Sequence, residues 1–448
     1  MTWIRTKSFI LLILFMSFGS VSGQETISLK EAIQHALQYK ADAIKANLNL
    51  ENADYQIAEA KAGALPKINA SGSINYNPIL QKTPLPGDFV GEPGTIIMVP
   101  FGQKWGSTIG VQLQQALFNQ RVFVGLKAAK TTKEFYQINK QLTDENLIEN
   151  VSTAYYQVFS AKQQLEAVDS SYASTLKIRN IIKSLYDNGL AKKVDLDRTN
   201  VNLTNLETTQ AKLRNAVTQS ENALKFYIGM PIDTKIQLKE ADLAVQPPLL
   251  EDHINVSERT ELQALNKQKE LLEYNLEATK AAYYPSLSLV GNYAWQGTGD
   301  KFPIGNGKGK GVYWTDYATI GLQLNIPIFN GFETKARVNQ NKIQLESLEA
   351  DIQDTRLGMD LEYENAKAQI ENSLQTIRNQ EANRDLAQTV LDNTRNNYQY
   401  GLASLTDLLD AENALVQAKN NYTDALLNFK IAEIQLYKAK GELNKLTE

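Results

Sequence analysis

The sequence predicts a mainly α-helical, exported protein with a transmembrane β part, built from two internal structural repeats. Three observations support this fold class. The chain begins with a short basic and then apolar segment, four later segments alternate apolar and polar residues, and two long stretches contain no proline. The second and third patterns occur in both halves of the chain, which indicates a duplicated unit.

The composition excludes several classes of protein. The chain has 448 residues, of which 43% are apolar, and it contains no cysteine and two histidines. Absent cysteine excludes a disulfide framework, a zinc–thiolate site, an iron–sulfur cluster, a cysteine nucleophile and a lipid anchor on an N-terminal cysteine. A net charge of −4 argues against a nucleic-acid partner. We therefore expect no metal site and no cofactor.

Residues 1–23 are predicted to be a secretory signal peptide and not part of the fold. Its start carries Arg5 and Lys7, an apolar core follows from Phe9 to Phe18, and small residues end it at Gly23. This segment is too short to span a bilayer as a helix, and no other stretch approaches about 18 consecutive apolar residues. Any membrane span of this chain must therefore consist of β-strands.

Two halves of the chain carry the same motifs. The segment STIGVQLQQALFNQ, which starts at Ser107, matches ATIGLQLNIPIFNG, which starts at Ala318. The segment YDNGLAKKVDL from Tyr186 likewise matches YQYGLASLTDL from Tyr398. Self-similarity at a nearly fixed offset indicates that the chain folds as two copies of one structural unit.

Each half is expected to contain a helix, two strands and a hairpin of long helices. We assign the first structural repeat to residues 24–228 and the second to residues 257–448. Residues 229–256 between them carry prolines and lack regular periodicity, which indicates a linker, or equatorial segment.

Four segments have the alternation expected of strands in a membrane β-barrel. Their apolar residues fall on one side, whereas the opposite side is polar and, apart from Lys67, uncharged. Aromatic residues cluster at the segment ends, where an interfacial girdle would lie. A half-solvated soluble sheet would also alternate, but four such strands behind an export signal favour the barrel. The predicted strands are at about 67–77, 107–118, 286–296 and 318–329.

Four strands cannot close a membrane barrel, which needs about eight or more. An open sheet edge in hydrocarbon would leave backbone groups unpaired. We therefore expect a homotrimer in outer-membrane lipid, since three copies give a 12-stranded barrel. A dimer would give a barrel too narrow to hold more than its own side chains.

The proline-free stretches predict helices longer than those of ordinary globular proteins. Helices of this length normally belong to coiled coils, and the last one has apolar residues every seven positions. Turns at 187–193 and 399–404 are expected to join the long helices in pairs. Gly189 and Gly401 would supply the left-handed conformation that ends a helix tightly.

The paired STIGVQL and ATIGLQL strands, each followed by FNQ or FNG, and the two YxxGL turns resemble the TolC-type outer-membrane efflux protein family. The resemblance covers about residues 28–445. It implies that the barrel is continued across the periplasm by a 12-helix coiled-coil α-barrel, so the protein would lie in the cell outer membrane with a long periplasmic extension. It also implies two partners besides the homotrimer: a periplasmic adaptor (membrane fusion protein) and an inner-membrane transporter of the RND type, with the ABC type as the alternative.

The resemblance further assigns roles to residues near the turns. Asp407 and Asp410 share one helix face at i and i+3, and Asp195 has the matching position in the first repeat, so together they would form a pore constriction that favours cations. Tyr398 corresponds to the tyrosine that locks neighbouring helices of the gate. Ala403 stands where some members have an arginine, so the basic partner of that lock is not identified.

The turns themselves would contact the adaptor through Gly189, Leu190, Gly401 and Leu402. An alternative interpretation of the aspartates is local, because carboxylates in a first helical turn are stabilised by the helix dipole.

These expectations predict a passive exit duct of a tripartite efflux or type I secretion system, opened by the adaptor and powered by the transporter. The alternative is a non-conducting trimeric stalk or tether of the outer membrane, which explains the long helices but not the uncharged polar side of every strand. An exported enzyme would have to use a carboxylate pair such as Asp195 and Asp197 on a helix without a cleft. We therefore do not expect an enzyme.

Overall fold

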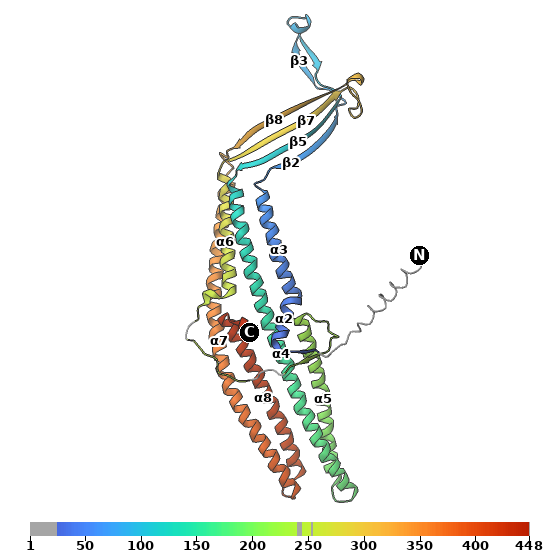
Figure 1. Cartoon of the computed structure of the whole chain (residues 1–448), viewed down its shortest axis with the longest axis vertical. Coiled ribbons are helices and arrows are strands. Elements are labelled where there is room, and N and C mark those ends of the chain that lie inside the picture. Colours follow the sequence, from blue (N-terminus) through green and yellow to red (C-terminus); the bar gives the residue numbers. More distant parts are fainter. Residues whose placement is uncertain (1–24, 240–243, 252–253, 448) are drawn as a thin grey trace, which may run out of the picture. The chain divides into compact units, whose positions relative to one another are not determined.

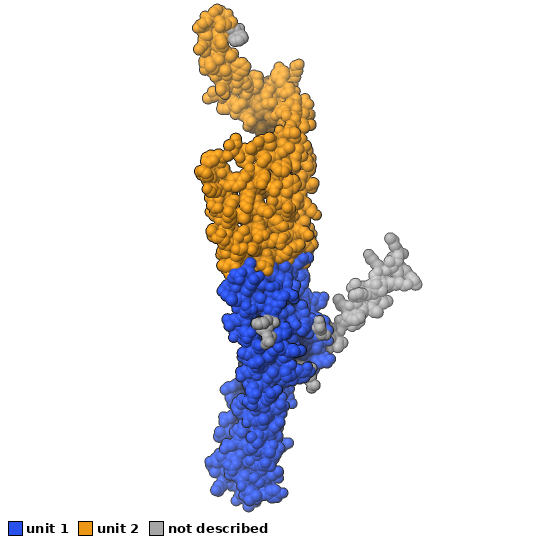
Figure 2. Space-filling view, turned by 90° about the vertical axis from the view of Figure 1, so that its left-hand side faces the viewer, with its two compact units in different colours: residues 1–49, 137–264, 352–448 blue, residues 50–136, 265–351 orange. Residues whose placement is uncertain are grey.

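The computed structural model describes residues 25–447 apart from 240–243 and 252–253. The predicted signal peptide at 1–23 lies outside the described residues. The chain divides into two compact units, coloured in Figure 2. Unit 1 contains residues 1–49, 137–264 and 352–448, and unit 2 contains residues 50–136 and 265–351.

The two units do not coincide with the two predicted repeats. Every crossing from one unit to the other lies inside a helix, namely α3 (Ala41–Ala62), α4 (Gln120–Asp187), α6 (Thr260–Lys280) and α7 (Glu333–Gln399). Each repeat therefore contributes residues to both units.

Unit 2 is built around a four-stranded antiparallel sheet in the order β2-β5-β7-β8 (Figure 1). The strands are β2 (Lys67–Tyr76), β5 (Trp105–Phe118), β7 (Ser286–Gly299) and β8 (Val312–Asn325). The first repeat contributes β2 and β5, the second contributes β7 and β8, and the two pairs join through β5 and β7.

The largest difference from the predicted strands is in β8, which was expected at 318–329 and runs instead over Val312–Asn325. The strand ends earlier because Pro327 has no backbone N–H to donate to a ladder. The strand starts earlier because β8 stays paired with β7 as far as Val312, opposite Gly299. The alternation did not predict this part because the charge of Asp316 interrupts it.

Two short strand pairs were not predicted by the alternation. They are the antiparallel pair β3 (Lys82–Pro86) and β4 (Ile96–Pro100) and the parallel pair β1 (Glu25–Ile27) and β6 (Ile236–Leu238). The hydroxyl of Tyr155 lies 3.3 Å from the carbonyl oxygen of Ile27 and 2.8 Å from that of Lys239. This buried tyrosine thereby holds β1 to the segment that contains β6.

Two long helical hairpins dominate unit 1. They consist of α4 with α5 (Lys193–Ile228) and of α7 with α8 (Leu405–Lys440), and α2 (Leu29–Tyr39) packs against them. Short 3-10 helices lie in both units, at Gly87–Val90, Ala281–Tyr283 and Lys308–Lys310 in unit 2 and at Val256–Glu258 and Leu443–Thr447 in unit 1. In α8 the seven-residue repeat buries Leu408, Leu415, Phe429 and Leu436. In the described part of the chain, no helix has an apolar window long enough for a membrane crossing.

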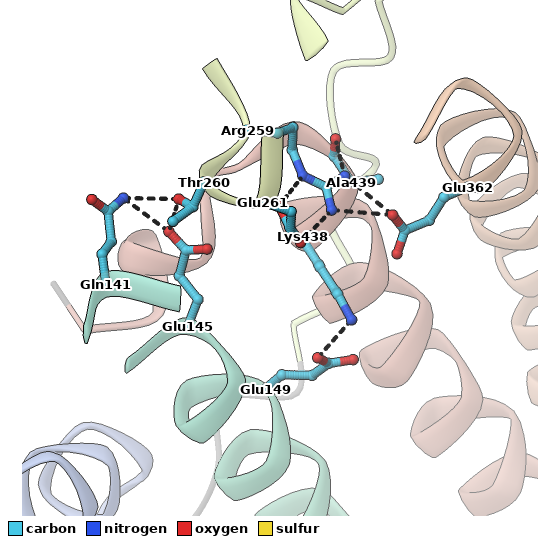
Figure 3. A network of polar contacts seen from close by, with 9 residues as sticks. All are labelled: Gln141, Glu145, Glu149, Arg259, Thr260, Glu261, Glu362, Lys438 and Ala439. Atoms are coloured by element: carbon cyan, nitrogen blue, oxygen red, sulfur yellow. Dashed lines mark hydrogen bonds and ion pairs between the residues drawn. The ribbon is translucent and has the colours of Figure 1, made fainter. Parts of the chain in front are cut away.

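A buried arginine fixes the start of α6 to α7 and α8 (Figure 3). Arg259 is 3% exposed, and its guanidinium donates to Glu261 at 3.1 and 2.8 Å, to Glu362 at 3.2 and 3.1 Å, and to the carbonyl oxygen of Ala439 at 3.0 Å. These five contacts match the five N–H groups of a guanidinium. Burial alone would lower the pKa of Arg259, but the bonds and charges of the two carboxylates raise it above its ordinary value.

In the first repeat, a lysine makes the equivalent contact with the end of a long helix. Lys40 directly precedes α3, as Arg259 precedes α6, and its ammonium donates at 2.8 Å to the carbonyl oxygen of Phe226 in the last turn of α5. The same ammonium lies 3.4 Å from the centroid of the Phe226 ring. Both α5 and α8 end at left-handed glycines, Gly229 with φ 77° and Gly441 with φ 72°. Each repeat thus places a cation against the last carbonyl groups of a long helix.

Candidate functional site

The residues predicted to act in gating and docking lie at the two helical turns of unit 1. Gly189 and Gly401 have φ values of 75° and 74°. The N–H groups of Leu190 and Leu402 each donate at 2.8 Å to the carbonyl oxygen five residues earlier. This is the six-to-one bond of a Schellman motif, which requires a left-handed residue before its last donor. The two repeats therefore end α4 and α7 with the same backbone geometry.

Large apolar side chains are exposed at both turns. Leu190 is 77% exposed, Leu402 is 78% exposed and Tyr400 is 81% exposed. Single exposed apolar residues are common on protein surfaces. Here, however, the two leucines occupy equivalent positions in two equivalent turns, so the structure presents the same apolar feature twice.

The start of α8 uses Asp407 in a capping box. Asp407 Oδ2 accepts bonds from the Ser404 N–H at 2.8 Å and from the Ser404 hydroxyl at 2.7 Å, and the Asp407 N–H donates back to Ser404 Oγ at 3.2 Å. The bonds from the Ser404 hydroxyl and N–H lower the pKa of Asp407 below its ordinary value. Asp410 lies one turn later and is exposed. Asp407 therefore caps its own helix and also keeps an exposed, ionised carboxylate.

Tyr398 connects the two hairpins at their turns. Its ring packs against an apolar cluster that contains Leu408 of α8 and against a second cluster that contains Ile182 of α4 and Leu405 of α8. Burial, and then the charge of Asp195, raise the pKa of Tyr398. The structure thus brings Tyr398 of the second repeat close to Asp195 of the first.

A bond between Arg198 and Thr406 also joins the two hairpins, and it was not predicted from the sequence. Arg198 of α5 donates at 2.6 Å to the hydroxyl of Thr406, which directly precedes Asp407 at the start of α8. Arg198 has the position in the first repeat that Asp410 has in the second. A comparison of the two repeats could therefore have singled out this arginine.

A buried carboxylate provides a further connection between the hairpins. The side chain of Glu412 on α8 is 4% exposed. Its Oε1 accepts a bond from Arg395 of α7 at 2.8 Å and from the hydroxyl of Ser174 of α4 at 2.6 Å. Arg395 also donates to Ser174 Oγ at 3.0 Å. The three side chains form a closed set of bonds that links α4, α7 and α8.

In unit 2, one face of the sheet is apolar except for Asp316, whose Oδ2 accepts a bond from the Tyr293 hydroxyl at 3.2 Å. Direct pairing aligns Val111 with Ala70 and with Tyr293, and it aligns Gly291 with Ile320. These side chains are exposed in the single chain, with Val111 at 43%, Tyr293 at 54% and Ile320 at 83%. The opposite face carries uncharged polar residues, such as Asn69, Gln112, Asn292 and Gln323. Such a sheet has two faces suited to two different solvents.

Among the described residues, no group of three or more histidine, aspartate or glutamate side chains could hold a metal ion.

Comparison with known proteins identifies the family. A family model described as "Outer membrane efflux protein" matches residues 32–230 and 256–442. The probable efflux pump outer membrane protein TtgC of Pseudomonas putida is 24% identical over 424 residues, covering 92% of this chain and 83% of that protein. The outer membrane protein TolC of Vibrio cholerae is 21% identical over 396 residues, covering 87% of this chain and 85% of that protein.

A solved structure has the same fold. The crystal structure of the Campylobacter jejuni CmeC outer membrane channel superimposes with a TM-score of 0.72 at 19% identity, covering 92% of this chain and 85% of that chain. The fold is therefore the predicted, mainly helical fold with a β part, and the two segments matched by the family model correspond to its two repeats. The chain belongs to the outer membrane efflux protein family, and it is an outer-membrane efflux channel and not an enzyme.

Proposed function

We propose that three copies of this chain assemble into the exit duct of a tripartite efflux or type I secretion system. The observation that carries the proposal is the open sheet of unit 2. Within the described residues, β2 pairs only with β5 and β8 pairs only with β7, so each has an unpaired edge. In hydrocarbon such edges must be paired. If β8 of one copy pairs with β2 of the next, three four-stranded sheets close a 12-stranded barrel, which is within the range of membrane barrels.

The polar face of the sheet supports a water-filled lumen. A barrel of this size with its apolar face toward lipid would direct Asn69, Gln112, Asn292 and Gln323 inward. Uncharged amides solvate polar cargo without binding it strongly. A duct of this kind discriminates weakly, so cargo selection is assigned to the transporter.

The long helices would continue the duct across the periplasm as a 12-helix coiled-coil α-barrel. The partners assigned on this basis are a periplasmic adaptor and an inner-membrane transporter of the RND type, with an ABC-type transporter as the alternative. The adaptor would contact the two turns, where Leu190 and Leu402 are exposed at equivalent positions next to Gly189 and Gly401.

The gate is assigned to the same ends of the helices. Asp195, Asp407 and Asp410 would form carboxylate rings in the trimer, and the exposed, ionised state of Asp407 supports this role. Tyr398 and the bond from Arg198 to Thr406 would hold the hairpins together in the closed state. Arg198 would then be the basic partner that Ala403 does not provide.

Single-channel recording in planar bilayers tests the proposal. We expect the wild-type protein to conduct and to prefer cations, because rings of carboxylates attract them. Asp407→Asn/Asp410→Asn should lose this preference, whereas the control Asp385→Asn/Asp392→Asn, which neutralises two exposed aspartates of α7, should keep it. Unchanged selectivity in the first variant would contradict the carboxylate ring. Absence of any conductance in reconstituted wild-type protein would contradict the duct and favour the tether.

A further inference from the structure

Two adjoining cavities lie where the strands of unit 2 join its helices. The larger has a volume of about 400 Å³ and is lined by Arg121, Arg337 and several amide side chains. The smaller has a volume of about 180 Å³ and is lined mainly by apolar residues. The two share Ala282, Pro327 and Asn330 in their walls. The two cavities are therefore adjacent, one with mainly polar walls and one with mainly apolar walls.

The polar cavity has a net positive charge. Its charged lining residues are Arg121, Arg337 and Glu333, and Lys335 lines the neighbouring cavity. Glu333 accepts a bond from Arg337 at 2.6 Å, and both side chains are largely exposed. Amides from both repeats, including Asn119 and Asn325, surround these charges. Guanidinium and amide N–H groups are the donors that bind phosphate oxygens.

The apolar cavity is lined by side chains that the described part of the chain leaves uncovered. Ile328 is 94% exposed, Phe329 is 73% exposed and Phe332 is 67% exposed. Phe332 has φ 66°, a left-handed conformation that bulky residues rarely adopt, and it is the only such non-glycine residue described. Its ring packs edge-on against Phe329 with 5.3 Å between ring centroids. The fold thus holds an aromatic pair at the surface, and the backbone of Phe332 is strained.

We propose that the two cavities form one binding site for an anionic glycerophospholipid of the periplasmic leaflet. Arg121 and Arg337 would bind the phosphate, and the acyl chains would pack on Phe329 and Phe332. A free phosphate ion would use the arginines but would leave the adjoining apolar cavity without an occupant, so the adjacency of the two cavities favours the lipid. The site rests on the proposed function only in requiring that the trimer is embedded in the outer membrane.

Native mass spectrometry of the detergent-released full-length protein tests this site. Three probes separate the chemistries: phosphatidylglycerol, which has phosphate and acyl chains; diacylglycerol, which has acyl chains alone; and inorganic phosphate. We expect retained phosphatidylglycerol, with much less diacylglycerol, and no displacement of the lipid by inorganic phosphate. Displacement by inorganic phosphate at millimolar concentration would overturn the lipid assignment, and equal retention of diacylglycerol would overturn the phosphate contact.

Two variants should change lipid retention in opposite directions. Arg121→Gln/Arg337→Gln should lower it about tenfold or more, because even one lost charge-assisted hydrogen bond corresponds to about that factor. Glu333→Gln should raise it, because Arg337 loses its competing carboxylate. The control Arg214→Gln/Arg378→Gln removes the same charge from exposed positions of α5 and α7 and should leave retention unchanged. Equal retention in all four proteins would overturn the proposal.

The copy number and conductance of each variant are measured on the same preparations. A conducting trimer that retains no phospholipid would contradict the lipid site and leave the duct intact. A wild-type protein that neither trimerises nor conducts would contradict the proposed function instead.

Discussion

Replacing Glu412 by glutamine should weaken the contact between α7 and α8 in unit 1. The buried carboxylate of Glu412 accepts bonds from Arg395 at 2.8 Å and from Ser174 at 2.6 Å, and these residues lie on three different helices. Glutamine has nearly the same shape and keeps one acceptor oxygen for Ser174. It removes the charge that pairs with Arg395.

The magnitude follows from the burial of the two partners. Breaking a fully buried ion pair costs about 3–5 kcal/mol. The Glu412 side chain is 4% exposed, but that of Arg395 is 42% exposed and can be rehydrated when it loses its partner. We therefore expect a loss of about 2 kcal/mol per copy. If the gate opens by separating α8 from α7, this loss corresponds to an increase of about 30-fold in the open-to-closed ratio of each copy.

Open probability in planar bilayers measures this ratio directly. Glu412→Gln should increase it, and Glu381→Gln provides a matched control. Glu381 is also paired with an arginine, Arg384, but at 3.5 Å and with its side chain 50% exposed, so its removal should have little effect. Equal open probability in Glu412→Gln and wild-type protein, with the trimer intact, would refute the role of this contact in gating.

Four further substitutions, grouped in three experiments, give tests at other positions. Leu322→Lys should prevent stable insertion, at a cost of about 2–4 kcal/mol on the lipid face. Gln323→Lys on the opposite face should insert and should reduce cation conductance. Heat-resistant trimer on gels measures insertion and bilayer recording measures conductance; poor insertion of both variants would contradict the assignment of faces. Arg259→Lys should lower the stability of unit 1 by about 2 kcal/mol in urea unfolding, because an ammonium cannot reproduce the five contacts of the guanidinium. Burial alone would raise the pKa of Glu261, but its bonds with Arg259 lower the pKa below the ordinary value of 4.5. The pair should therefore stabilise the wild-type protein above pH 4.5 and lose this contribution as the pH falls below that value. An Arg259→Lys protein with the same acid sensitivity as the wild type would be inconsistent with this. Gly401→Ala should cost about 1–2 kcal/mol of stability because φ is 74° there, and a neutral effect in urea unfolding would exclude the left-handed turn.

The elements that could be predicted from the sequence are those with a local physical cause. Alternation identified the strands because the two faces of each strand face different surroundings, and the repeated motifs identified the duplication. The turns were predictable because a left-handed glycine at position 189 or 401 ends a helix whatever surrounds it. Strand ends were less accurate where a charge such as Asp316 or a proline interrupts the pattern.

The elements that were missed depend on contacts between distant parts of the chain. Arg259 binds Glu362 and the carbonyl of Ala439, which are 103 and 180 residues away. Arg198 and Thr406 are 208 residues apart. No local periodicity encodes such pairs. The short strands β1 and β6 have three residues each, too few for alternation to be recognised.

The copy number of the protein extracted from the outer membrane in detergent shows whether the sheet edges are joined between copies. Native mass spectrometry of the untreated complex should give three chains, because only joined copies can pair the free edges of β2 and β8. A homogeneous single chain that stays folded in buffer without detergent would contradict the account.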